Sequence, residues 1–171
     1  MAYRFVDPLV VNAPSSIVSA STTPVVPVGT ERRAVDSTRG EGLFKYLPGC
    51  DSADAGIMVT WKQSLSGVNS SAATANTANQ GRPLAVAMAA VPSRTYGWFQ
   101  IAGFAIIKKT AVKVTAGSKI FQSATAGRIT GAAVTGRQIL NAVATPSATV
   151  ASATSTVIVE INRPFLQGQV I

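Results

Sequence analysis

The residues of this chain that could do chemistry are few, and the 171-residue sequence contains no histidine. The absence of histidine excludes His-based acid–base catalysis, His-containing catalytic triads and His metal sites. The single cysteine, Cys50, excludes an intrachain disulfide and has no histidine with which to form a thiolate pair. The abundant serine and threonine hydroxyls lack an activating histidine for the same reason.

The acidic and lysine residues also predict no active site. Only seven residues are Asp or Glu, and they are too dispersed to form a catalytic carboxylate pair. Asp51 and Asp54 lie in one predicted turn and could hold at most a weak cation. Lys108 or Lys109 could act as a base, but lysines beside a buried strand usually mark its exit to solvent. We therefore predict no enzymatic activity and no catalytic, cofactor-binding or metal-binding residues.

The segment Arg39-Gly40-Glu41-Gly42 has the glycine content of an anion-binding loop. It lacks the strand–loop–helix setting and the Gly-Lys-Ser/Thr ending of a phosphate-binding loop. We therefore interpret it as a turn with local ion pairs, next to a short strand that ends at Pro48-Gly49.

Three aromatic residues, Trp61, Tyr96 and Trp98, could form an exposed platform on which a sugar ring stacks. Aromatic residues on alternating strands are more often anchors of a core or of a subunit interface. We favour a structural role for them and expect Trp98 to be buried.

The net charge is +8, from 15 Lys and Arg against 7 Asp and Glu, yet charged residues make up only 13% of the chain. The cations are scattered from Arg4 to Arg163, with Arg32-Arg33 and Lys108-Lys109 as the only adjacent pairs. This distribution favours docking on an acidic protein surface, or simple solubility, over specific nucleic-acid binding. No segment approaches the ~18 consecutive apolar residues of a membrane span, and no signal peptide is apparent. The low charge indicates that a partner covers much of the surface.

The fold is predicted around Tyr96–Lys109, the densest aromatic segment of a chain that is only 6% aromatic. Its β-branched and aromatic residues are typical of strands buried on one or both faces. Ala102-Gly103 is a plausible bend, because glycine accepts the dihedral angles found there. We interpret the segment as the central hairpin or kinked strand pair of the domain.

Short apolar segments separated by small turns continue along the rest of the chain. We expect strands at Leu43–Leu47, Ala55–Lys62, Pro83–Val91, Val112–Val114, Lys119–Gln122, Arg128–Thr130, Gln138–Ala144 and Ser155–Asn162. Of these, Pro83–Val91 is ambiguous, because its Ala and Met residues also suit a short helix, and we favour a buried strand. In the last of these, Ile158 and Glu160 should face away from Val157 and Val159, and Arg163-Pro164-Phe165 should end the strand. Ser64–Gly81 and Thr145–Thr154 are predicted loops. About nine strands and no long periodic helix predict an all-β fold, a compact antiparallel barrel or sandwich.

Residues 1–30 are predicted to be an extended, proline-rich N-terminal arm, and residues 31–171 a single β-rich domain. Pro8, Pro14, Pro24 and Pro27 exclude a helix and a central strand in the arm. Its apolar segments, such as Leu9–Val11, are too hydrophobic for a solvated tail. The arm should therefore lie along its own domain or along a neighbouring subunit, and we favour the neighbour.

Five segments in this order resemble the capsid cement, or head decoration, proteins of tailed bacteriophages. They are VDSTRGEGLFKYLPG (35–49), GRPLAVAMAAV (81–91), YGWFQIAGFAIIK (96–108), VTAGSKIFQSATAGRIT (114–130) and STVIVEINRPF (155–165). The individual motifs are short and degenerate, so their order carries more weight than any one of them. The arm matches this pattern less well.

The resemblance implies a non-enzymatic virion protein on the outer surface of the capsid, made in the host cytoplasm. Such proteins commonly form homotrimers and cement neighbouring major capsid proteins against the internal pressure of the DNA. The expected partners are therefore the major capsid protein and further copies of the chain. The alternatives are another phage structural β-protein, such as a tail-tube component, or a carbohydrate-binding surface module.

Overall fold

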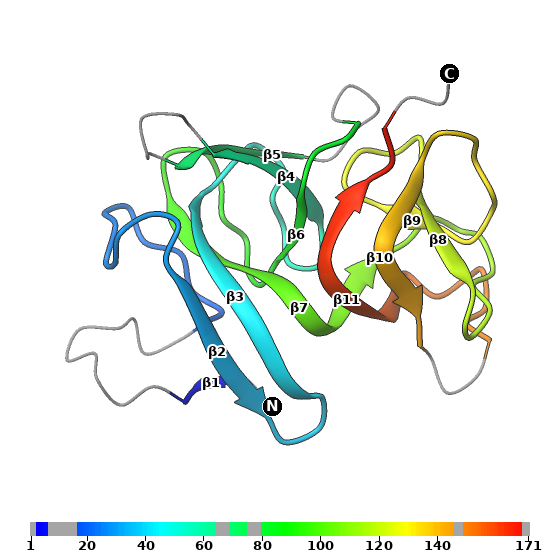
Figure 1. Cartoon of the computed structure of the whole chain (residues 1–171), viewed down its shortest axis with the longest axis horizontal. Coiled ribbons are helices and arrows are strands. Elements are labelled where there is room, and N and C mark those ends of the chain that lie inside the picture. Colours follow the sequence, from blue (N-terminus) through cyan, green and yellow to red (C-terminus); the bar gives the residue numbers. More distant parts are fainter. Residues whose placement is uncertain (1–2, 7–16, 64–68, 75–79, 146–148, 169–171) are drawn as a thin grey trace.

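The structure, a computed structural model, describes residues 3–6, 17–63, 69–74, 80–145 and 149–168. These residues form eleven β-strands and no helix (Figure 1). In chain order the strands are β1 (Arg4–Phe5), β2 (Glu31–Asp36), β3 (Gly40–Pro48), β4 (Met58–Gln63), β5 (Asn69–Thr74), β6 (Leu84–Ala87), β7 (Tyr96–Lys108), β8 (Lys119–Gln122), β9 (Ile129–Thr130), β10 (Gln138–Ala144) and β11 (Thr156–Leu166).

All eleven strands belong to one antiparallel sheet, whose main path runs β1-β2-β3-β7-β11-β10-β8-β9. Strands β4, β5 and β6 branch from this path, because β6 pairs with both β4 and β7. The end strands β1 and β9 do not pair with each other, so the sheet is not closed into a barrel. The prediction of an all-β antiparallel fold is confirmed. The closed barrel, one of the two architectures that we predicted, is not found.

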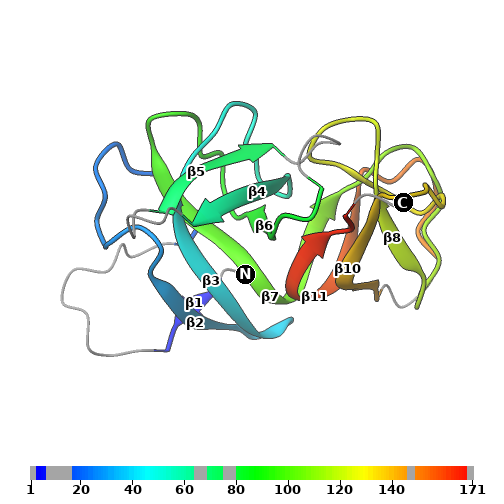
Figure 2. The same cartoon turned by 45° about the horizontal axis from the view of Figure 1, so that its top comes forward.

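The central strand β7 joins the two halves of the sheet, as Figure 2 shows. Its first half pairs with β3 and its second half with β11. At the junction the register with β3 shifts, and Gly103 has a φ of 95°. A Cβ atom at Gly103 would lie 2.5 Å from the carbonyl oxygen of Glu41, so only glycine fits there. The predicted bend at Ala102-Gly103 is therefore confirmed. The predicted central hairpin or strand pair is wrong, because Tyr96–Lys108 is one continuous strand that pairs with β3 and β11.

Three hydrophobic clusters lie against the sheet. The C-terminal cluster packs inward-facing residues of β7 to β11, such as Ile107 and Val159. The middle cluster lies around Phe99 and Ile101, and the N-terminal cluster around Trp98 and Phe44. Because Trp98 and Phe99 are consecutive residues of a strand, β7 contributes to a cluster on each of its faces.

The arm packs on its own domain where the structure describes it. Arg4 and Phe5 pair with β2, and Ser21 forms a bridge with Tyr96. Tyr3, Ile17 and Val26 are buried in the N-terminal cluster. We had favoured a neighbouring subunit as the surface that the arm covers. The described parts of the arm instead lie on their own domain. The apolar segment Leu9–Val11 lies outside the described residues.

Some strand predictions were wrong. Strand β2 was not expected, because its inward-facing residues include only one hydrophobic side chain, Ala34. Strand β5 lies in the predicted loop Ser64–Gly81, and Val112–Val114 forms only a single bridge, between Val114 and Val150. Strand β11 continues beyond Arg163-Pro164, because the chain bulges there and Phe165 then pairs with Leu140.

Candidate functional site

The residues considered for acid–base or cation chemistry do not form a site. Asp51 and Asp54 are both exposed and have different partners. The Ser93 hydroxyl donates to Asp51 Oδ1 over 2.5 Å, and Lys108 Nζ lies 3.4 Å from Asp54 Oδ2. In the described part of the chain, no three Cys, Asp or Glu residues are grouped so as to hold a metal ion. Cys50 is a buried thiol in the middle cluster.

Lys109 is buried, whereas we expected it to mark the exit of a strand to solvent. Its Nζ donates to three backbone carbonyl oxygens, those of Thr110 at 3.2 Å, Val112 at 2.9 Å and Ser152 at 3.2 Å. Burial lowers the pKa of this ammonium group, because charge is disfavoured away from water. Lys109 is only 1% exposed, and its ammonium group ties the loops of Val112 and Ser152 together.

The predicted turn at Arg39–Gly42 is only partly found. The turn comprises residues 37–39, and Gly40, Glu41 and Gly42 already belong to β3, while the predicted local ion pairs are present. Gly40 has a φ of 71°, and Arg39 Nη2 lies 3.2 Å from Asp36 Oδ2. Asp36 Oδ1 also accepts from the backbone N–H groups of Thr38 and Arg39. These hydrogen bonds, first of all the one from Thr38, lower the pKa of the Asp36 carboxyl. The turn uses its donors internally.

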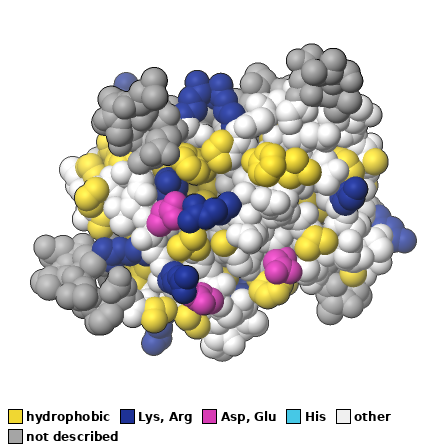
Figure 3. All heavy atoms as spheres, in the orientation of Figure 1, with side chains coloured by type: hydrophobic (Ala, Val, Ile, Leu, Met, Phe, Trp, Pro, Cys, Tyr) yellow, Lys and Arg dark blue, Asp and Glu magenta, His cyan; other side chains and the backbone are white. Residues whose placement is uncertain are grey.

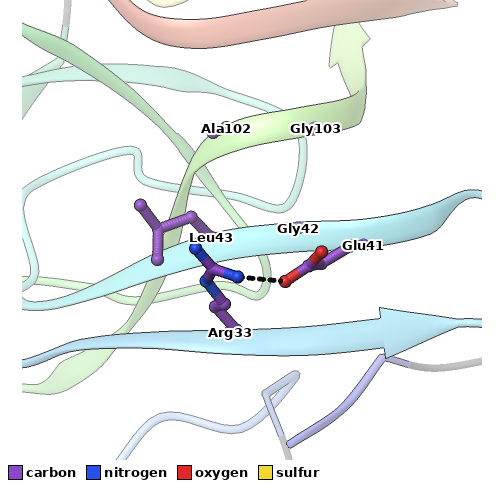
Figure 4. Close-up of a pocket in the computed structure, with 6 residues that line it drawn as sticks. All are labelled: Arg33, Glu41, Gly42, Leu43, Ala102 and Gly103. Carbon is purple, nitrogen blue, oxygen red and sulfur yellow. Dashed lines mark ion pairs between the residues drawn. The ribbon is translucent and has the colours of Figure 1, made fainter. Parts of the chain in front are cut away.

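A hollow of about 260 Å³ lies beside this turn, where β3 passes the bend of β7. Figure 4 shows the Arg33–Glu41 ion pair along one side of it, with a distance of 3.2 Å between the charged atoms. Its lining residues are Arg33, Glu41, Gly42, Leu43, Ala102 and Gly103. Among the described residues, this lining provides no nucleophile and no unpaired acid or base.

The three aromatic residues do not form a sugar-binding platform. Trp98 is 1% exposed and lies 5.1 Å from the Tyr46 ring, measured between ring centroids. Trp61 belongs to a different cluster, and Lys45 Nζ lies 4.1 Å from the centroid of its ring. The expected burial of Trp98 is confirmed.

A charged network holds the two halves of the sheet together on the side of Lys45. Glu31 accepts from Arg163 Nη2 at 2.6 Å and from Lys45 Nζ at 3.2 Å. Arg163 has a φ of 48°, which directs it out of the β11 bulge toward a residue far away in the sequence. The hydrogen bond from Arg163, and then that from Lys45, lower the pKa of the Glu31 carboxyl.

This network makes a pH-dependent contribution to stability. Since the folded state lowers the pKa of Glu31, the contribution is present above the unfolded pKa and is lost as the pH falls through the folded pKa. We expect Glu31→Gln to cost on the order of 1 kcal/mol at neutral pH, discounted for partial exposure. Thermal unfolding between about pH 7 and pH 3 should show that the variant loses less stability on acidification than the wild type. Equal losses in the two proteins would contradict this role.

The most distinctive surface feature is an apolar strip on the outer face of β7 and β11. Phe104 and Ile106 on β7 and Ile158 on β11 are 38%, 42% and 39% exposed. Ile106 lies opposite Ile158 and Phe104 opposite Glu160 in the strand register. We call these four residues, Phe104, Ile106, Ile158 and Glu160, the β7–β11 strip. Exposed large hydrophobic residues that are neighbours in space indicate a binding surface.

The sequence revealed part of this strip. The alternation in β11 predicted that Ile158 and Glu160 face away from the core, and both are exposed. It did not show that Phe104 and Ile106 are exposed, because the run Phe104–Ile107 is apolar throughout. The contacts of Lys109 and of Arg163 were also missed, since each depends on residues brought together only by the fold.

On the face of the molecule that Figure 3 shows, hydrophobic side chains form scattered patches and acidic side chains are few. No helix that could cross a bilayer is found among the residues that the structure describes. The chain matches no protein-family model, no curated protein and no solved structure.

Proposed function

We propose that this protein is a non-enzymatic structural component of a phage virion that binds the outer surface of the capsid. It cements neighbouring major capsid proteins and so stabilises the head against the pressure of packaged DNA. The ordered resemblance of residues 35–165 to head decoration proteins suggests this role. The observation that carries the protein-binding part of the proposal is the exposed β7–β11 strip.

The strip supports a role in protein binding because covering these exposed apolar side chains with a partner lowers the free energy of the complex. Burying apolar area contributes about 25 cal/mol per Å². Three large aliphatic or aromatic side chains from adjacent strands can therefore form the centre of an interface. Neither a substrate nor a cofactor is needed to explain them.

The charge of the chain supports a second contact, with an acidic surface. The net charge of +8 is spread over the molecule, which suits docking on a broad acidic protein face better than reading a nucleic acid. Weak contacts of this kind become strong when several linked subunits bind one shell at once. An oligomer that meets several capsid proteins would in this way act as a clamp.

The test is to locate the chain on the virion. Cryo-electron microscopy of particles that contain this protein should place its density on the outer face of the head, in contact with the major capsid protein. Heads that lack it should take up the purified protein and resist heating better afterwards. Density in the tail tube, or failure to bind such heads, would overturn the proposal.

A further inference from the structure

The β7–β11 strip contains one charged group, the carboxylate of Glu160, and this carboxylate has no ion-pair or hydrogen-bond partner among the described residues. Seven residues of the chain are acidic, and one of them, Asp7, lies outside the described residues. Five of the other six have an ion pair or a hydrogen bond from a side chain. Glu160 has neither with any described residue, although it is exposed beside Phe104.

Two cations beside the strip are already neutralised. Lys108, the next outward residue of β7 after Ile106, forms an ion pair with Asp54. Arg39, which lines a hollow next to Ile106, forms an ion pair with Asp36. The strip therefore presents an apolar centre with a single free negative charge, and its partner should present apolar groups with a free positive charge.

We propose that the β7–β11 strip is an interface that docks on a second copy of this chain, with Glu160 paired to a lysine or arginine of that copy. A copy of this chain has the required chemistry, because its net charge is +8. Five of its exposed cations have no ion pair or hydrogen bond from their side chains among the described residues: Arg4, Lys62, Arg94, Lys113 and Lys119. An acidic capsid surface would instead be repelled by Glu160.

The inference deepens the proposed function by assigning different surfaces to its two partners. The strip would bind another subunit, and the basic surface would bind the capsid. Contact between subunits needs no capsid, so it can be measured in the purified protein.

The experiment is sedimentation velocity of the purified full chain from about 1 to about 100 µM. We expect the wild type to form an oligomer, and Ile106→Thr combined with Ile158→Thr to raise its dissociation constant at least about tenfold. Glu160→Lys should raise it similarly, because it places a positive charge against the partner's cation. The control is Val35→Thr on β2, since Val35 is 44% exposed and lies outside the strip.

At concentrations where wild type and variants are all monomeric, the strip variants should unfold near the wild-type temperature, because the replaced side chains are exposed. Hydroxyl-radical footprinting of the wild type gives a readout that needs no variant, and Phe104 should become protected as the oligomer forms. A wild type that stays monomeric throughout would overturn the inference. So would an oligomer that leaves Phe104 unprotected, or one that the Val35 variant weakens as much as the strip variants do.

The two proposals fail in distinguishable ways. If the oligomer depends on the strip but does not bind heads, the capsid role falls and the interface stands. If the protein binds heads as a monomer, the interface falls and the capsid role stands.

Discussion

Replacing Lys109 with methionine is expected to destabilise the protein by about 3 kcal/mol. Methionine keeps most of the length and the apolar stem of the side chain but removes the ammonium group. Three backbone carbonyl oxygens, of Thr110, Val112 and Ser152, then lose their donor. A buried acceptor left without a partner costs about 1–3 kcal/mol. Ser152 is exposed, so water can hydrate that carbonyl in part and lower the total.

A second effect opposes this loss. The ammonium group of Lys109 is itself desolvated in the folded state, as its lowered pKa shows, and methionine removes that penalty. We expect the loss of the carbonyl contacts to exceed it, because three charge-assisted hydrogen bonds end on one group. The same contacts hold the segments 110–112 and 152 together, so amide exchange there should quicken in the variant.

The neighbouring lysine provides a matched control. Lys108→Met makes the same chemical change one residue earlier in the chain. The Lys108 side chain is 29% exposed, and its partner Asp54 is 65% exposed. Such a pair contributes about 0–1 kcal/mol. Urea or thermal unfolding should therefore separate the two variants by about 2 kcal/mol. Equal stability of the two variants would show that Lys109 does not hold its loops together.

Strands could be predicted from the sequence where polar and apolar residues alternate along the segment, or where β-branched residues are frequent. The range of β10, Gln138–Ala144, was predicted to the residue. The strands expected at Lys119–Gln122 and Arg128–Thr130 are also found, as β8 and β9, and they pair with each other. These segments follow local rules of side-chain alternation and turn formation. Their strand character depends little on distant residues.

The features that sequence reasoning missed depend on distant parts of the chain. Strand β2 has the charged residues Glu31 and Arg33 on its outer face, and it forms because β3 offers it a partner. β11 passes Pro164 because a bulge absorbs the residue that cannot donate to the ladder. The strip is recognisable only when Ile106 and Ile158 are placed side by side. The candidate site was therefore less predictable than the fold.

The second prediction concerns the arm, which belongs to the core more than its sequence indicated. Replacing Tyr3 with alanine is expected to cost about 3 kcal/mol, although Tyr3 is only the third residue of the chain. Tyr3 is 4% exposed, and its ring lies edge-on to Phe44 with 4.8 Å between the centroids. Its hydroxyl donates to the carbonyl oxygen of Phe104 at 3.0 Å and accepts from Gln100.

Two further variants separate the ring from the hydroxyl and from the backbone pairing. Tyr3→Phe keeps the ring and should cost about 1 kcal/mol, the net contribution of a hydrogen bond. Arg4→Ala, on the exposed side of β1, should change stability by less than about 0.5 kcal/mol. Chemical denaturation followed by tryptophan fluorescence suits the series, since Trp98 lies in the same cluster as Tyr3.

This prediction changes how a contact between the arm and the capsid would have to be tested. If the arm were a separable appendage, removing residues 1–28 would leave the domain intact, and any loss of head binding would measure the arm's own contact with the capsid. In the structure the same deletion removes the buried side chains of Tyr3, Ile17 and Val26, so the truncated protein should be destabilised before it meets a head. Wild-type stability in Tyr3→Ala would restore the view of a separable arm. A large loss would mean that head binding has to be tested with substitutions on the exposed side of the arm, such as Arg4→Ala, which leave the core in place.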